Sequence, residues 1–599
     1  MGQPAIMEKL ILNDINEIIS SYNNKSVQII DGLYYNQYQT IKQIEFYWNS
    51  QYISGQFDEI GRIKPFYNIS KFRVNVATRA TDLDVKDVRI TSDNRNDRVR
   101  SMLLNHELKN WFKEVGFSKL LNDWGKTRAK YGGALIKKYK DEDGELKIEL
   151  VEWKNVITDQ TDIENGVVIE VHYMSPSELS KKNGVWNNVP EAMKLATKSR
   201  GMKGNKDQAT EKRIPIYEVH GEFPANYNPE TPDADPNKYE RMTFIIAGSD
   251  TSKQIILWHE MEDENPYSYL GWDSVTGRGL GIGIVEDGFQ AQMWTNEAIT
   301  AEKNVMDLAG KVFIKTNASS LQNNIIADME NGQVIKLEAN EDANILNLTP
   351  SSLPQFQNLV EKWNTQYERS TNTFDSVSGE TLPSNTPLGS VAIQSAQASS
   401  FFDYRREEAG IYWSNVLMEW VLPYLIKKIN KDHILASDFS IEELKIIDKS
   451  FSIYEANNRV KEAVLSGKII GEGQYDEAVQ AFTDFIAQDG KRRYLDVPKG
   501  YFKDYEDNVT IDITGETRNK QAMLQSLDNI LAKIQANPAI LTDPNASQLL
   551  SEMLELSGIN FMPQPVPQVV PEAPKSSPRS AKPSAVEQNT QAVLPQAQQ

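Results

Sequence analysis

Residues 390–430 constrain the fold more than any other part of the chain, because almost nothing in them breaks a helix. They contain one glycine, Gly410, and one proline, Pro423. About 40 residues could therefore form one helix roughly 60 Å long at 1.5 Å per residue. Because Pro423 has no backbone N–H, we expect it to kink or end this helix. With 599 residues in total, the chain is long enough for several packed units.

The sequence before residue 280 divides into a mainly helical part, 1–130, and a β-rich part, 131–270. Apolar residues recur at helical spacing over 6–19 and 103–121. An acidic turn with an Asp-Gly pair predicts a hairpin of strands 135–139 and 146–152. Further strands are predicted at 166–173, 216–223, 242–246 and 254–258. The expected fold class is α+β, mainly helical.

One segment of the β-rich part, 181–213, differs from the chain in charge. It holds nine Lys or Arg and three acidic residues, so its net charge is 9 − 3 = +6, against −19 for the chain. Only Trp186 could supply stacking to a nucleic-acid base. We therefore interpret the segment as a solvated insertion rather than a DNA-binding patch.

Composition excludes several classes of protein. The chain has no cysteine, which rules out disulfide frameworks, thiolate zinc sites and cysteine nucleophiles. No apolar run approaches the roughly 20 residues of a membrane span, and the N-terminus lacks the basic flank and apolar core of a signal peptide. We expect a protein made in the cytoplasm. A net charge of −19 argues against tight binding of nucleic acid through its phosphates.

The candidate motifs for catalysis or cofactor binding are all incomplete. Gly125-Lys126-Thr127 ends like a P-loop, but Leu120 stands where the first glycine is required. The alternating glycines at 277, 279, 281 and 283 do not fit the dinucleotide fingerprint. The five histidines show no metal-binding spacing. The sequence therefore predicts no catalytic residue, no metal site and no cofactor, and the alternating glycines predict a tight bend before a helix.

The second half of the chain is predicted to alternate helices, short strands and one loop. Helices are expected at 284–309 and 353–374, with a strand at 311–315 and another at 333–337 after the Asn331-Gly332 turn. Two glycines and two prolines mark 376–389 as a loop. A strand is expected at 509–513, helices follow between 517 and 556, and the Pro- and Gln-rich end is expected to be disordered.

The order of these parts resembles the portal proteins of tailed bacteriophages. The most characteristic stretch is GRGLGIGIVEDGFQAQ at 277–292, and a second is TLPSNTPLG at 381–389, leading into the long helix. The resemblance covers about 34–559 and depends on order and spacing rather than on any single motif. It implies the following parts: a wing at 1–280, stem helices at 284–309 and 353–374, a clip at 310–352, a tunnel loop at 375–389, a long kinked helix at 390–430, a wing return at 431–515, a crown at 516–560 and a disordered tail at 561–599.

The resemblance also implies which residues face DNA or contact partner proteins. Side chains of the tunnel loop would face DNA, namely Ser378, Glu380, Ser384, Asn385 and Thr386. Candidates for the channel face of the stem are Glu286, Glu297, Glu302 and Lys303. Candidates for clip contacts with a terminase or adaptor are Asn323, Asn324 and Asn331. Five acidic residues against one lysine in 284–309 would surround DNA with negative charge, so that the duplex slides rather than binds.

In such a ring of about twelve copies, the partners would be the chain itself, the major capsid protein, the terminase during packaging, adaptor or tail proteins, and double-stranded DNA held without tight binding. The location would be the portal vertex of the virion, and the host cytoplasm during assembly, with no enzymatic activity. Two alternatives stay open. A DNA-processing enzyme of packaging, such as a terminase subunit, would need an intact P-loop or a carboxylate cluster, and a non-portal virion ring or adaptor would hardly need a helix of about 40 residues.

Overall fold

The structure is a computed structural model, and it describes only part of the chain. The described residues are 3–58, 61–83, 85, 88–92, 97–141, 143–198, 213–249, 253–309, 313–317, 337–346, 353–374, 388–431, 434–435, 439–467, 471–488, 494–495, 497–503, 505 and 509–512. They belong to one compact unit, residues 1–515. The segments predicted as crown, 516–560, and disordered tail, 561–599, lie outside the described residues.

The first part of the chain is mainly helical, as expected. Its elements are α1 (Gln3–Asn24), β1 (Val27–Ile30), β2 (Leu33–Tyr35), α2 (Gln37–Trp48), α3 (Ile69–Ala80), β3 (Arg89–Ser92), α4 (Arg98–Val115) and α5 (Phe117–Tyr131). Asn36 caps α2 and Asn68 caps α3, each accepting a backbone N–H from the first turn of its helix. The helical pattern over 103–121 belongs to two helices, because Gly116 at φ 68° ends α4 and begins α5.

Two antiparallel sheets follow where strands were predicted. Their strands are β4 (Gly133–Lys140), β5 (Leu146–Leu150), β6 (Val156–Ile157), β7 (Val168–Met174), β8 (Ile214–Pro224), β9 (Tyr239–Ala247), β10 (Ile255–Met261) and β11 (Tyr267–Gly271), with single 3₁₀ turns η3 (Trp153–Asn155) and η4 (Ala225–Tyr227). Within the described residues the strand orders are β10-β9-β8-β7-β6 and β11-β4-β5. The predicted β4–β5 hairpin is confirmed, and the predicted strands β9 and β10 also pair antiparallel.

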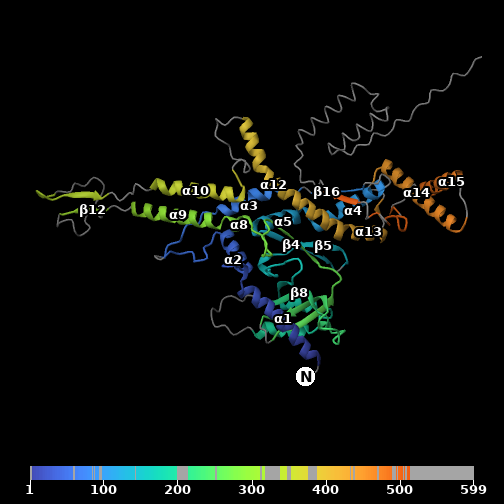
Figure 1. The fold of residues 1–599 in the computed structure, drawn as a ribbon, viewed down its shortest axis with the longest axis horizontal. Coiled ribbons are helices and arrows are strands. Elements are labelled where there is room, and N and C mark those ends of the chain that lie inside the picture. Colours follow the sequence, from blue (N-terminus) through green and yellow to red (C-terminus); the bar gives the residue numbers. More distant parts are fainter. Residues whose placement is uncertain are drawn as a thin grey trace, which may run out of the picture. The chain divides into compact units, whose positions relative to one another are not determined.

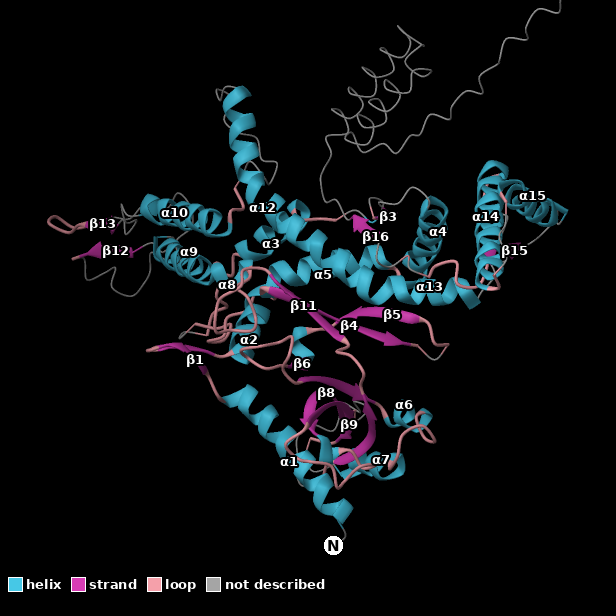
Figure 2. Cartoon of the chain, turned by 45° about the vertical axis from the view of Figure 1, so that its right-hand side comes forward, coloured by secondary structure: helices cyan, strands magenta, loops and turns pink. Residues whose placement is uncertain are grey.

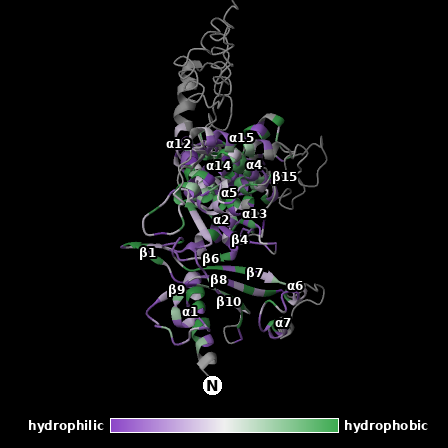
Figure 3. Ribbon diagram, turned by 90° about the vertical axis from the view of Figure 1, so that its right-hand side faces the viewer, coloured by the Kyte–Doolittle hydropathy of each residue, from purple (hydrophilic) through white to green (hydrophobic). Residues whose placement is uncertain are grey.

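Helices pack on both faces of the larger sheet, and Figure 3 shows α1, α6 and α7 beside its strands. From α1, Ile11 and Ile15 pack with Val219 and other odd-numbered residues of β8. On the opposite face, α6 (Pro176–Lys181) and α7 (Val189–Lys198) pack against even-numbered residues such as Ile216. Val189 and Ala192 of α7 are fully buried. The interpretation of 181–213 as a solvated insertion is therefore wrong for α7, because one face of this helix belongs to the core. Residues 181–188 are mostly exposed, as that interpretation expects.

A long helical hairpin extends from these layers (Figures 1 and 2). It consists of α8 (Ile284–Asp287), α9 (Phe289–Ala309), β12 (Phe313–Thr316), β13 (Ala343–Leu346) and α10 (Leu353–Thr371). The predicted helix 284–309 is interrupted at Gly288. The strand that pairs with β12 is β13, ten residues beyond the predicted strand at 333–337, of which only Leu337 is described.

The predicted long helix exists, and Pro423 does not end it. It comprises α12 (Leu388–Val416), a π-helical turn η7 (Leu417–Val421) and α13 (Leu422–Lys431). The wide turn stands directly before Pro423, where the missing N–H removes an α-helical hydrogen bond. Trp413, Leu417 and Leu425 on this helix pack with α4, α5, β4 and β5 in the largest cluster of buried apolar residues.

The remaining elements return the chain to its first part. They are β14 (Ile434–Leu435), α14 (Ile441–Leu465), α15 (Glu472–Gln488), β15 (Tyr494–Leu495) and β16 (Val509–Asp512). The predicted strand at 509–513 is confirmed as β16, which pairs antiparallel with β3 near residue 90. The last described strand, β16, thus pairs with a strand more than 400 positions earlier in the sequence.

The alternating glycines pack their backbone directly against the end of α5. A Cβ on Gly281 would lie 2.5 Å from Gly132 O, and one on Gly283 would lie 2.8 Å from Lys130 O. Trp272 N donates to Gly132 O at 2.8 Å, and Ile282 N donates to Asp273 O at 2.8 Å, so the glycine segment is tied to residues that are themselves bonded to the end of α5. The bend predicted from the glycines is present, and its cause is this close approach of two backbones.

We expect Gly283→Ala to lower the free energy of unfolding by about 1–3 kcal/mol, because a methyl group there overlaps backbone atoms that cannot rotate away. Gly125→Ala is the matched control, since Gly125 lies inside α5 with open space around it. That change should be neutral or stabilise by up to about 1 kcal/mol. Thermal and denaturant unfolding of both variants checks the prediction. Equal effects would show that the backbone contact is unimportant.

Candidate functional site

The helical hairpin is anchored by a tyrosine where its two helices meet the rest of the protein. Tyr367 of α10 is fully buried, and its hydroxyl donates to Ile284 O at 3.1 Å. Its ring occupies the space where Gly288 would carry a side chain. Gly288 separates α8 from α9. Because it has no side chain, Tyr367 of α10 can pack against the junction of these two helices.

Buried amides fix the orientation of α9. Gln292 Oε1 accepts hydrogen bonds from Ile69 N at 3.0 Å and from Ser70 N at 3.1 Å. One turn later, Asn296 Oδ1 accepts from Tyr67 N at 2.8 Å. Both amides are almost fully buried. Because such amides are costly to leave unpaired, they determine which face of α9 turns toward α3 and the segment before it.

The predicted channel residue Glu286 lies in a different environment from the other three candidates. Its carboxylate accepts two hydrogen bonds from the Arg278 guanidinium, at 2.9 and 2.8 Å. That guanidinium stacks on the ring of Tyr35, 4.0 Å from its centroid. Burial favours the neutral form of Arg278, but Glu286 outweighs it and raises the pKa of Arg278. Glu286 thus joins the glycine-rich bend to the hairpin base.

The remaining three candidates lie on one helix but point in different directions. Glu297 of α9 is exposed, whereas Glu302 and Lys303 are half-buried. At about 100° per residue, Glu297 and Glu302 point about 140° apart, and Lys303 points about 100° from Glu302. No single face of α9 therefore carries all three side chains.

The other predicted site residues lie outside the part of the chain that the structure describes. They include the tunnel-loop candidates, namely Ser378, Glu380, Ser384, Asn385 and Thr386. The same holds for the clip candidates Asn323, Asn324 and Asn331. The described part of the clip segment consists of β12, β13 and the residues beside them.

A buried charged cluster on the larger sheet was missed at the sequence level. Strand pairing sets Glu170 of β7 opposite Glu218 of β8. Together with His172, these carboxylates bring possible metal ligands within 4.8 Å of one another. However, Lys137 Nζ lies 2.9 Å from Glu170 Oε1 and 2.8 Å from Glu218 Oε1. This ammonium already pairs with both carboxylates, so we assign the cluster a structural role. The alternation of Glu170 with His172 and of Glu218 with His220 is the signal that could have revealed it.

His220 is the buried centre of this cluster. Its Nε2 faces Glu218 Oε1 at 3.2 Å, and its Nδ1 faces Glu262 Oε1 at 2.5 Å. Two carboxylate acceptors require both ring nitrogens to carry protons, so the ring is an imidazolium. Burial opposes this charge, but the hydrogen bonds to Glu218 and Glu262 raise the pKa of His220 overall. The same contacts lower the pKa of Glu262 against the effect of burial.

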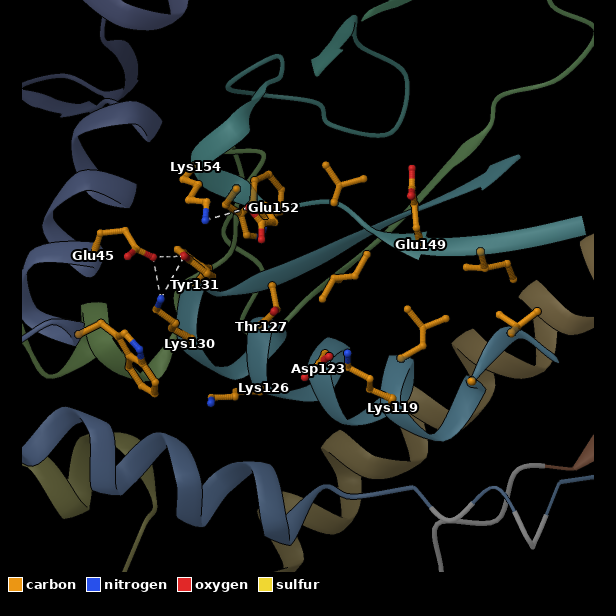
Figure 4. A pocket seen from close by; sticks show the side chains of 18 of the residues that line it. Glu45, Lys119, Asp123, Lys126, Thr127, Lys130, Tyr131, Glu149, Glu152 and Lys154 are labelled. Atoms are coloured by element: carbon orange, nitrogen blue, oxygen red, sulfur yellow. Dashed lines mark hydrogen bonds and ion pairs between the residues drawn. The ribbon is translucent and has the colours of Figure 1, made fainter. Parts of the chain in front are cut away.

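Residues 125–127, which end like a P-loop in the sequence, lie in the middle of α5 and line a groove. Lys126 is exposed, and the residues before it, from Phe117, are helical rather than a phosphate-binding loop. The groove measures about 710 Å³ and lies between α2, α5 and the strand β5 with the residues after it (Figure 4). Within it, Lys130 Nζ lies 2.7 Å from Glu45 Oε1, which also accepts from the Tyr131 hydroxyl. Burial raises the pKa of Glu45, but these two donors lower it overall.

No protein-family model matches the chain, and no curated protein is significantly similar to it. Among the described helices, none combines the length and apolar character that a membrane span needs.

We expect the stability of the protein to fall as pH rises through the raised pKa of His220. The imidazolium contributes its full stabilisation below its ordinary pKa of about 6.5, and this contribution is lost as the pH passes the higher pKa of the folded state. His220→Gln should cost about 3 kcal/mol at pH 6, because the Glu218 and Glu262 carboxylates each lose a buried cationic partner. It should also flatten the profile of Tm between pH 6 and 9.

His259→Gln on β10, the edge strand of the same sheet, is the control, since His259 forms no ion pair with any described residue. Its profile should match that of the unsubstituted protein. His172, whose hydrogen bond to Glu218 raises its pKa, leaves some pH dependence in His220→Gln. An unchanged profile in His220→Gln would contradict the assignment of the charge to His220.

Proposed function

We propose that the chain is the subunit of a portal ring of a tailed bacteriophage. Such a ring stands at one vertex of the capsid and passes double-stranded DNA during packaging and ejection. It acts as a channel and docking platform without enzymatic activity. Its partners are further copies of the chain, the major capsid protein, the terminase, and adaptor or tail proteins. The protein would reside at the portal vertex of the virion, and in the host cytoplasm before assembly.

The observation that carries this proposal is the helical hairpin with a β-hairpin at its far end. α9 and α10 pack side by side, with Trp294 stacked on Trp363 at a centroid distance of 6.1 Å. β12 and β13 pair antiparallel between the two helices in the sequence. This order corresponds to the stem and clip that the resemblance implies, and the glycine-rich bend and long helix stand on either side of it in the sequence.

Exposed apolar side chains on the hairpin support an assembly of copies. Met293 and Trp294 on α9 are 37% and 43% exposed, and Leu359 on α10 is 39% exposed. Leu359 lies one turn from Trp363, on the same side of α10. Grouped apolar side chains on a surface commonly mark contacts between proteins. In a ring, a neighbouring hairpin would cover them.

The charge of the hairpin fits a channel for DNA only in part. Glu297 is exposed and could face a duplex, whereas Glu286 is engaged by Arg278. Negative side chains cannot release counterions from DNA, so they allow sliding. The lining of the proposed channel therefore rests on Glu297 and on the tunnel loop, because Glu302 and Lys303 point more than 100° away from Glu297.

We expect the purified protein to form rings of about twelve subunits in negative-stain images and to show no ATPase or nuclease activity. Met293→Ser with Leu359→Ser should shift the protein toward monomers, because it removes exposed apolar area proposed to lie between copies. The monomer itself should keep its Tm, since neither side chain is buried. Tyr239→Ser is the control, because Tyr239 on β9 is 60% exposed and lies far from the hairpin in the sequence.

Protein that stays monomeric at all concentrations would contradict the portal proposal. Nucleotide hydrolysis that is lost in Lys126→Ala would instead favour an enzyme. If the double variant still forms rings, the portal proposal stands, but the contact between copies does not involve Met293 and Leu359.

We expect Ser384→Lys with Asn385→Lys to impair DNA passage without impairing assembly. The double substitution adds two bases per subunit, or about 24 in a ring of about twelve, and each phosphate neutralised strengthens salt-dependent binding. Packaging or ejection measured at increasing ionic strength should show a defect that eases with salt. Normal packaging at every salt concentration would remove residues 375–389 from the channel.

A further inference from the structure

The β1–β2 hairpin presents an apolar tip to solvent. Ile30 and Leu33 lie opposite each other beside the turn at Asp31 and Gly32, and they are 64% and 48% exposed. Tyr34, the next residue, is 62% exposed. β1 and β2 form a two-stranded sheet of their own, and Figures 2 and 3 show the hairpin projecting from the elements around it. Neighbouring apolar side chains on a projecting surface are typical of a contact with another protein.

The base of this hairpin is anchored, although its tip is exposed. Lys25 O accepts from Asn36 Nδ2 at 2.9 Å and from Gln160 Nε2 at 3.0 Å. Tyr35, the last residue of β2, is buried, and the Arg278 guanidinium stacks on its ring. Both ends of the hairpin are therefore fixed before any partner binds. An arm ordered in advance loses little conformational entropy on binding, which favours one defined docking site.

The groove beside α5 offers an apolar surface with room for several side chains. It measures about 710 Å³, and its lining includes the half-buried side chains of Val115, Leu120 and Leu150. Its described lining also holds four lysines and four carboxylates, so the net charge is 4 − 4 = 0. A groove without net charge does not select an ion. It suits apolar side chains, whose removal from water is favourable.

The tip of the β1–β2 hairpin does not fill the groove of its own chain. None of the described lining residues belongs to β1 or β2. The hairpin leads into α2 at Gln37, whereas Trp48 and Asn49 line the groove at the other end of this helix, about 16 Å away at 1.5 Å per residue. A tip and a groove at two places on one molecule make a head-to-tail contact between copies, which gives a ring where the rotation closes.

We infer that the tip of the β1–β2 hairpin of one copy docks into the groove beside α5 of the next copy. Ile30 and Leu33 would lie against the apolar lining and lose their contact with water. The inference deepens the proposed function and rests on it, because it names a contact between neighbouring subunits of the ring. This contact is separate from the one proposed at Met293 and Leu359.

Disulfide cross-linking tests the contact, because the chain contains no cysteine of its own. Ile30→Cys is combined in one chain with Asn49→Cys, Lys119→Cys or Lys126→Cys, which change exposed groove positions after α2 and on α5. A disulfide needs Cα atoms within about 7 Å of each other. At least one pair should give a ladder of covalent oligomers on oxidation, because each chain carries both halves of a head-to-tail contact. Ile30→Cys with Val185→Cys is the control and should give no ladder, since Val185 is 61% exposed and lies outside the groove.

Substitutions at the tip test its share in assembly. Ile30→Ser with Leu33→Ser should raise the protein concentration at which half of the chain is assembled about tenfold, because it removes apolar area from the contact. Val185→Ser removes a similarly exposed apolar side chain elsewhere and should leave this concentration unchanged. Equal effects of the tip and control substitutions would overturn the inference. Circular dichroism checks that each variant is folded.

The outcomes separate this contact from the portal proposal. Rings in negative-stain images with no cross-link at any of the three groove positions would overturn the contact and leave the portal proposal standing. Ladders from protein that forms filaments instead of rings would support the contact and contradict the portal ring. Protein that stays monomeric at all concentrations would contradict both.

Discussion

The contact on which the rest of the structure depends is the packing of two glycine-rich backbones, at 132–133 and at 281–283. Three elements meet there, the end of α5, the start of β4 and the turn into α8. Ile282 N donates to Asp273 O at 2.8 Å, which ties the bend to the residues after β11 as well. Side chains at these positions would hold the elements apart. The glycines therefore determine the direction in which the helical hairpin leaves the sheet.

Buried charges make a second constraint on the same layers. Lys137 of β4 reaches Glu170 and Glu218 of the other sheet, so one ammonium links the two sheets. Arg128 of α5 is buried and bonds to Gly271 O at 2.9 Å and to Arg405 O at 3.0 Å on the long helix. Removing one member of such a group leaves the others charged and without solvent, which costs more than the pair itself contributes. These contacts specify how sheets and helices are placed relative to one another.

Local patterns in the sequence predicted most elements but not their partners. The β4–β5 hairpin, the helix before residue 24 and the bend at 277–283 each depend on neighbouring residues, so turn chemistry and periodicity suffice. The pairing of β16 with β3, and of β12 with β13, joins segments that no local rule connects. For the candidate site, the acidic bias of α9 was visible, but the engagement of Glu286 by Arg278 was not.

The burial pattern along the hairpin bears on why a ring would be needed. On α9, the fully buried residues end at Ala298, and on α10 they begin at Tyr367, so burial among the described residues concentrates at the base. Farther out, the described contacts of α9 include α10 and the Arg62 guanidinium, which reaches Asp307 at 3.2 Å. Two helices with few other neighbours bury too little apolar area to be stable alone. Under the proposed function, neighbouring copies supply that missing area, and the anchored base keeps every hairpin in the same direction before the copies meet.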